Sequence, residues 1–158
     1  MTVDPVTWRN SRPGKRIGAG ALIRDDVGRV LVVEPTYKQT WELPGGSVEA
    51  EESPRAACQR ELLEELGLDL PVGRMLCFEW QGPEPDRTES LMLVFDGGVL
   101  PAGATITLPA DELASYRFVE PEELSGLMIE RLSRRTLAAL RALAEGRLTE
   151  LEHGVPVD

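Results

Sequence analysis

Apolar side chains along the chain gather into short runs that predict more strands than helices. Within the third such run, alternation places Leu76, Phe78 and Trp80 on one face. The first two runs flank Asp25-Asp26-Val27-Gly28, which is turn chemistry, so we expect them to pair as a hairpin. The runs with the length and content of strands are residues 16–24, 29–34, 70–80, 90–95 and 115–119.

Two longer segments have the composition and spacing of helices. Residues 56–66 contain no glycine, proline or β-branched residue, which gives them high helix propensity. Ser53 is suited to cap this helix, Pro54 to occupy its first position and Gly67 to end it. Residues 128–145 predict a second, amphipathic helix.

The first helix separates carboxylates from apolar side chains. At about 100° per residue, Glu61, Glu64 and Glu65 fall on one face. The apolar residues that we expect on the opposite, buried face are Ala56, Leu62, Leu63 and Leu66. This helix is therefore predicted to bury one side and to present three carboxylates on the other.

The order of these elements predicts an α/β fold in which helices cover both faces of a mixed sheet. A length of 158 residues corresponds to one domain, with its core from about residue 16 to 145. Residues 1–14 are polar and predict an arm, either pinned to the body by Trp8 or frayed. The polar stretch after residue 146 predicts a weakly structured tail.

Charge and cysteine content narrow the partners of the chain. The net charge is −10, from 27 acidic and 17 basic side chains. This argues against a nucleic-acid polymer, whose binding depends on Lys and Arg, but not against a small phosphorylated substrate. There is no apolar run for a membrane span and no signal-peptide core. Cys58 and Cys77 form no disulfide framework, so we expect both to be reduced and the protein to be cytoplasmic.

Three adjacent carboxylates on one helix face repel one another and raise each other's pKa. A hard divalent cation would remove this repulsion. Ligands that are all oxygens suit Mg2+, or Mn2+, better than zinc. The alternative is that Glu61, Glu64 and Glu65 form a solvated acidic face that binds nothing.

The segment from Gly46 to Leu68, GSVEAEESPRAACQRELLEELGL, resembles the Nudix box, G-x5-E-x7-R-E-U-x-E-E-x-G-U, where U is an apolar residue. Every specified position is filled. The chain is thus similar to the Nudix hydrolases, and this resemblance implies an α/β/α sandwich. It also implies hydrolysis of a nucleoside diphosphate linked to another group X, in which water attacks a phosphorus atom of the pyrophosphate.

The resemblance also implies roles for individual residues. Glu61, Glu64 and Glu65 would ligate the metal, and the backbone carbonyl of Gly46 would add a ligand. Glu52 and Arg60 would hold each other and brace the loop against the helix. The general base would be Glu64 or an acid from a distal loop; the acids available there are Glu112, Glu120, Glu122 and Glu123. The only histidine, His153, is expected to be incidental.

The group X is less specified. The basic residues that we select as substrate-binding candidates are Arg24, Lys38 and Arg87. Three aromatic residues, Tyr37, Trp41 and Trp80, are available to stack on a base, with core or loop packing as the alternative. Pro83 lies sixteen residues after Gly67, as in members that cleave ADP-ribose, which favours ADP-ribose or nucleotide-sugar substrates.

Two other functions stay open from the sequence. One is a MutT-like pyrophosphohydrolase of nucleoside triphosphates. The other is a catalytically silent nucleotide sensor, against which the complete set of box glutamates counts. The resemblance also makes a homodimer one of the assemblies to expect, although no segment of the chain predicts one.

Overall fold

Strands β1 (Arg16–Arg24) and β2 (Val30–Pro35) form the hairpin that the apolar pattern predicted. In the turn, a side-chain oxygen of Asp25 accepts hydrogen bonds from the backbone N–H groups of Val27 and Arg29. Gly28 has a φ of +89°, which favours glycine. Short-range turn chemistry therefore accounts for the start of the sheet.

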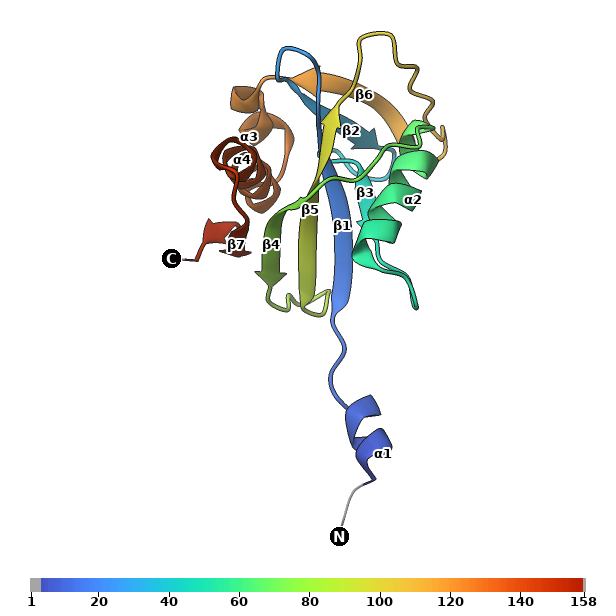
Figure 1. Ribbon diagram of the computed structural model, residues 1–158, viewed down its shortest axis with the longest axis vertical. Helices are drawn as coiled ribbons and strands as arrows, with labels where there is room; N and C mark the ends of the chain where they lie inside the picture. The colour runs from blue at the N-terminus through green and yellow to red at the C-terminus, as the bar shows by residue number, and fades with distance from the viewer. Residues whose placement is uncertain (1–3, 158) are drawn as a thin grey trace.

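The structure is a computed structural model that describes residues 4–157. The remaining elements extend the hairpin into a sheet with helices on both sides (Figure 1). In chain order they are α1 (Pro5–Asn10), β3 (Gly45–Ser47), α2 (Pro54–Leu66), β4 (Met75–Gln81), β5 (Ser90–Val99), β6 (Leu113–Val119), the 3-10 helix η1 (Pro121–Glu123), α3 (Leu124–Leu127), α4 (Glu130–Glu145), β7 (Thr149–Glu152) and β8 (Val155–Pro156).

The sheet is mixed, with the strand order β6-β2-β1-β5-β4-β7-β8. Strand β1 runs parallel to β5 along its whole length. Its other edge is shared, because β3 pairs with residues Gly18–Gly20 and β2 pairs at Arg24. One edge of β1 therefore pairs with two different strands, and β3 brings the Gly45-Gly46 backbone beside the centre of the sheet.

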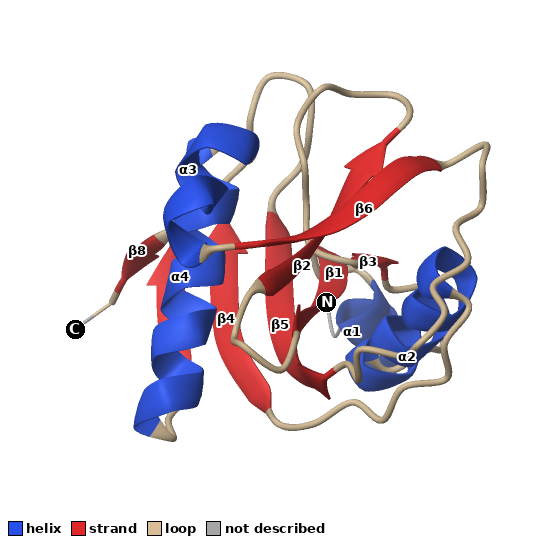
Figure 2. Cartoon of the chain, turned by 90° about the horizontal axis from the view of Figure 1, so that it is seen from above, coloured by secondary structure: helices blue, strands red, loops and turns tan. Residues whose placement is uncertain are grey.

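Helix α2 covers one face of the sheet, and α3 and α4 cover the other (Figure 2). Each interface has its own buried core, which includes Ala57, Leu62 and Leu66 under α2 and Leu124 and Ala139 under α3 and α4. The predicted α/β/α sandwich is confirmed. Within residues 4–157, no helix combines the length and apolar character needed to cross a membrane.

Helix α2 begins and ends as predicted. Ser53 Oγ accepts from the backbone N–H of Ala56, and Gly67 adopts a left-handed conformation. The predicted apolar face was partly wrong, because Ala56 and Leu63 are exposed while Glu65 is buried. The buried stripe follows Cys58, Leu62 and Glu65 at helical spacing, so it is rotated toward the acidic side.

Two strand predictions were wrong because of bulges. The register of β4 shifts between Met75 and Cys77, so Leu76 packs under α4 whereas Phe78 packs on the α2 side. The strand beginning at Ser90 does not end at Phe95, as predicted. It continues to Val99, because Gly97 is accommodated as an extra residue opposite β1.

The two ends of the chain behave differently. Helix α1 buries no side chain, and Trp8 is 52% exposed, so the N-terminal segment is an arm that Trp8 does not pin to the body (Figure 1). Residues 1–3 lie outside the described part. The C-terminal segment was predicted as a weakly structured tail, and this was wrong. It adds β7 and β8 to the sheet and buries Thr149 and Leu151.

Candidate active site

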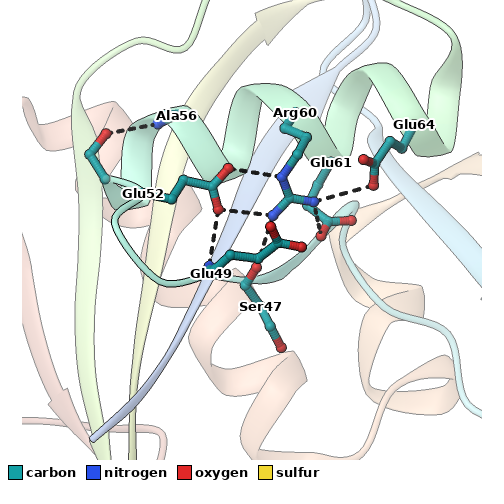
Figure 3. Close-up of polar contacts among 8 residues, drawn as sticks. Ser47, Glu49, Glu52, Ala56, Arg60, Glu61 and Glu64 are labelled. Carbon is teal, nitrogen blue, oxygen red and sulfur yellow. Dashed lines mark hydrogen bonds and ion pairs between the residues drawn. The ribbon is translucent and has the colours of Figure 1, made fainter. Parts of the chain in front are cut away.

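Arg60 lies at the centre of a cluster of carboxylates on α2 and the loop before it (Figure 3). Its Nε and Nη2 donate to the two carboxylate oxygens of Glu52, at 2.8 Å and 3.0 Å. Its Nη1 donates to Glu61 at 2.8 Å and to Glu64 at 3.2 Å. The paired carboxylates in turn raise the pKa of Arg60. One guanidinium therefore orients three of the glutamates that the sequence singled out.

Glu52 also fixes the loop that precedes α2. The hydrogen bonds from Arg60 lower the pKa of Glu52 to about 2, with a smaller effect of the backbone N–H of Glu49, which donates to Glu52 at 3.0 Å. Arg60 Nη2 reaches the carbonyl of Ser47 on β3 at 3.1 Å. The contact expected between Glu52 and Arg60 is thus present, and it joins β3, the loop and α2.

Glu65 lies on the inner side of the cluster and is 8% exposed. Burial raises the pKa of its carboxyl to about 8, and the charges of Glu61, Glu42 and Glu112 act in the same direction. The backbone N–H of Gly45 donates to Glu65 Oε2 at 2.9 Å and opposes the shift. To ionise near neutral pH, this buried carboxyl group requires a compensating positive charge.

Glycine is required where β3 meets the cluster. A Cβ on Gly46 would lie 2.4 Å from the carboxyl carbon of Glu61. Gly45 has a φ of +149°, and a Cβ there would lie 2.4 Å from the carbonyl oxygen of Ala19. The backbone of β3 therefore approaches the glutamates more closely than any residue with a side chain would allow.

These residues suit a divalent metal ion by their chemistry. Within residues 4–157, no three acidic, His or Cys side chains converge closely enough to hold an ion as they stand, and Arg60 contacts both Glu61 and Glu64. The available donors are nevertheless all oxygens, from the glutamates and the Gly46 carbonyl. The Gly46 backbone lies against Glu61, and Glu65 is buried beside it. All-oxygen donors favour Mg2+ or Mn2+.

A cavity of about 330 Å³ opens beside this cluster, on the α4 side of the sheet. Glu65, Gly45 and Gly46 line one end of it. Two of the predicted basic residues, Lys38 and Arg87, also line it. Arg24 does not belong to this lining, because it lies at the far end of β1 and pairs with Asp96. Arg24 is therefore set apart from the other candidates.

The four distal acids named as candidate general bases differ in their surroundings. The charge of Glu112 acts on Glu65, where it raises the pKa. Glu120 and Glu123 form the capping box of η1, in which the Glu123 carboxylate accepts from the backbone N–H of Glu120 at 2.8 Å. Glu122 is exposed at the surface. Glu112 is thus the distal acid that the fold brings within electrostatic reach of the cluster.

The aromatic candidates and the histidine also differ in whether they line the cavity. Tyr37 lines the cavity and is 75% exposed. Trp41 packs against the core and against Arg117, so its side chain serves packing. The Trp80 indole donates to Glu89 and contacts the His153 ring edge-on, with 5.3 Å between centroids. Neither Trp80 nor His153 lines the cavity.

Both cysteines are free and buried. Burial raises the pKa of the Cys58 thiol and of the Cys77 thiol to about 12. Neither thiol is therefore available as a thiolate near neutral pH.

One charged pair at the cavity was not predicted from the sequence. Glu79 of β4 is fully buried and forms an ion pair with Arg135 of α4, which lines the cavity. The sequence signal was an acid alternating with Phe78 and Trp80 in an apolar strand. Pairing it with Arg135 requires knowing that α4 crosses that face of the sheet.

Comparison with known proteins agrees with this geometry. A family model described as NUDIX domain matches residues 14–141. A "MutT-like protein" of Streptomyces ambofaciens is 33% identical over 123 residues, which cover 77% of this chain and 74% of that protein. The crystal structure of a MutT protein from Methanosarcina mazei Go1 is 28% identical, with a TM-score of 0.66, and the match covers 86% of this chain and 97% of the other.

A solved UDP-X diphosphatase has a TM-score of 0.73 at 19% identity, and the match covers 95% of this chain and 76% of the other. At this identity the likeness shows the fold alone.

Proposed function

The chain belongs to the Nudix family of hydrolases, which act on phosphorus-containing anhydrides, and from this premise we propose that it cleaves the pyrophosphate bond of a nucleoside diphosphate joined to a group X. Nucleotide sugars and ADP-ribose-like compounds are the first class to test. The observation that carries the proposal is a single cavity lined by Glu65 and Gly46 at one end and by the cations Lys38 and Arg87 elsewhere.

The glutamates and glycine of the cluster have separate tasks in this proposal. Glu61, Glu64, Glu65 and the carbonyl of Gly46 would hold Mg2+ or Mn2+. When bound, the cation supplies charge neutralisation for the diphosphate and lowers the pKa of water. Arg60 acts as a positioning residue, because it contacts Glu61 and Glu64 while anchored to Glu52.

Proton transfer is assigned to Glu64. Its side chain is 54% exposed and its contact with Arg60 is the longest that Arg60 makes in the cluster, at 3.2 Å. Glu64 would accept the proton of the attacking water as the new O–P bond forms and the P–O bond to the leaving phosphate breaks. Glu112 is the second candidate, because its charge already acts on Glu65.

Lys38 and Arg87 are proposed to contact the substrate phosphates or X. Lys38 pairs with Glu42 at 2.5 Å, and Arg87 pairs with Glu84 at 3.2 Å. Each pair is at least partly exposed, so an anionic ligand competes with a weak ion pair. The cytoplasm remains the proposed compartment, in keeping with two free thiols.

The test is a hydrolysis panel with Mg2+ that contains nucleotide sugars, ADP-ribose and nucleoside triphosphates. The wild type is expected to release product from at least one diphosphate-linked compound. Glu64→Gln should reduce turnover by about 10²–10⁴-fold. The exposed Glu150→Gln makes the same chemical change outside the cavity and should have no effect. A wild type that binds a nucleotide but hydrolyses none would favour the sensor instead, and turnover of triphosphates alone would favour the MutT-like alternative.

A further inference from the structure

The cavity has a second polar end, which lies over β4 and β5 and away from the glutamates. Paired positions on neighbouring strands share a face, and Gln81 of β4, Ser90 of β5 and Arg16 of β1 are paired in this way. Glu79 lies two residues before Gln81 on β4 and therefore on the same face. Arg135 reaches down from α4 to Glu79, which places it beside Gln81.

Arg135 is held at one nitrogen and free at the others. Its side chain is 6% exposed, and its Nε donates to Glu79 Oε2. The other oxygen of Glu79 accepts from the backbone N–H of Gly154 at 2.5 Å, so both oxygens are occupied. Neither Nη of Arg135 has a partner among residues 4–157, although the residue lines the cavity. Arg135 therefore presents a fixed pair of donors to a ligand.

The charge of Arg135 is already balanced by Glu79, whereas Arg16 at the same end of the cavity donates, within residues 4–157, only to Thr88. Glu79 is fully buried and neutralises Arg135. A second anion placed against Arg135 would have to share this one positive charge with Glu79, which is costly for buried side chains. Arg135 therefore favours a neutral group with hydrogen-bond acceptors over a phosphate or a carboxylate.

Gln81 adds a further polar group without a partner. It is 9% exposed and lines the same cavity. Its Nε2 has no hydrogen-bond partner among the described residues. A buried amide left unpaired is unfavourable, and a rotation of the Gln81 side chain toward the cavity would let an acceptor on a ligand satisfy it.

The distance between the two ends fits a nucleotide. From β3, where Gly46 meets Glu61, the sheet passes through β1 and β5 to β4. Three steps between strands of about 4.8 Å give about 14 Å. A diphosphate held at the glutamates would thus extend its ribose and base across β1 and β5 toward Arg135.

We propose that Arg135, positioned by Glu79 and assisted by Gln81, recognises the nucleobase, and that the preferred base is a 6-oxopurine. The planar fork of arginine matches two adjacent acceptors, and guanine offers such a pair in O6 and N7. Adenine places an amino donor where O6 would be, so it would face the donors of Arg135. This inference rests on the proposed function, and within that class it favours GDP-linked over ADP-linked substrates.

The test measures binding without metal or turnover. Calorimetric titrations in EDTA would use GMP, IMP, AMP and 7-deaza-GMP as probes. GMP and IMP share O6 and N7, whereas AMP lacks O6 and 7-deaza-GMP lacks N7. GMP and IMP are expected to bind about ten-fold more tightly than the other two. Equal or tighter binding of AMP would overturn the proposal, and so would the absence of binding by all four probes.

Two arginine variants on one helix identify the residue responsible. Arg135→Lys retains a positive charge for Glu79 but loses the planar fork, so the preference for GMP over AMP should disappear. Arg141→Lys makes the same change at an exposed position of α4 outside this cavity and should retain it. A preference that survives in Arg135→Lys would overturn the proposal. If Arg135→Lys does not fold, Gln81→Leu replaces it, with a lowered preference expected and an unchanged one contradictory.

The outcomes separate this inference from the proposed function. Base-selective binding by a protein that hydrolyses nothing would refute the hydrolase and retain the base site. Hydrolysis by a protein without base selectivity would retain the hydrolase and refute the base site.

Discussion

Arg60 binds Glu52 through two parallel hydrogen bonds, Nε to Oε1 at 2.8 Å and Nη2 to Oε2 at 3.0 Å (Figure 3). Glu52 precedes α2 in the loop, and Arg60 lies in the second turn of the helix. This bidentate contact determines where the remaining nitrogen of Arg60 lies, and that nitrogen contacts Glu61 and Glu64. The positions of the proposed metal ligands thus depend on a pair that binds no metal itself.

Replacing Glu52 by Gln should therefore weaken metal binding without removing a ligand. The amide accepts at one atom only, so Arg60 loses one of its two hydrogen bonds and is free to rotate toward Glu61 and Glu64. Residues that orient metal ligands typically contribute 10–100-fold to affinity or activity. The measurement is the affinity for Mn2+, together with kcat/KM.

Glu49→Gln is the matched control for Glu52→Gln. It makes the same charge change in the same loop, but only the backbone of Glu49 takes part in the network. An equal loss in both variants would show that the net charge of the loop, and not the clamp, matters.

Gly46→Ala should displace Glu61 while leaving the fold intact. The added Cβ would lie 2.4 Å from the Glu61 carboxyl carbon, which is the end of a flexible side chain and can move away. We expect at least a ten-fold loss of metal affinity and a nearly unchanged melting temperature. Gly103→Ala, at a glycine with no atom within 4 Å of an added Cβ, should change neither. Full activity of Gly46→Ala would argue against a close approach of β3 to Glu61.

The stability of the metal-free protein should fall between pH 5 and pH 8 because of Glu65. Its folded pKa of about 8 lies above the ordinary value of 4.5, so the folded state holds the proton more tightly. Its favourable contribution is fully present below about pH 4.5 and is lost as the pH rises through 8. The loss is on the order of a few kcal/mol.

Urea unfolding in EDTA across this pH range would measure that loss. Glu65→Gln should lack it, because the amide does not titrate. Glu64→Gln removes a neighbouring but exposed carboxylate and should retain it. Parallel pH profiles for wild type and Glu65→Gln would mean that Glu65 is not protonated in the fold.

Strand β7, near the C-terminus, should contribute to stability. Leu151 is fully buried in the core under α4, whereas Leu148 is 55% exposed. Leu151→Ala is expected to lower the free energy of unfolding by about 2–5 kcal/mol. Leu148→Ala should change it by no more than about 0.5 kcal/mol. Similar, small effects of both variants would indicate that β7 is not part of the stable sheet.

Local signals predicted the parts of this fold that depend on local physics. Ser53 and Gly67 bound α2 because capping is decided within a few residues. The pairing of Glu52 with Arg60 also joins neighbours in sequence and was expected. Mg2+ at the glutamates and the homodimer stay predictions.

Features that depend on distant partners were missed. The segment after Gly146 is polar in composition, yet β7 pairs with β4, which lies about seventy residues earlier. Nothing near Leu151 in the sequence announces that partner. Likewise, Glu79 and Arg135 meet only because α4 crosses β4, and the exposure of Leu63 depends on how α2 is rotated against the sheet. Bulges had the same effect on the predicted face of residues 76–80.

The carboxylates of α2 are proposed above all to bind a divalent cation. The most direct measurement is titration of the protein with Mn2+, followed by electron paramagnetic resonance of the free ion, with and without a nucleotide. The wild type is predicted to bind at least one ion, and Glu61→Gln combined with Glu65→Gln is predicted to bind none at the same concentrations. If the wild type takes up no Mn2+ under either condition, the account of this site is contradicted.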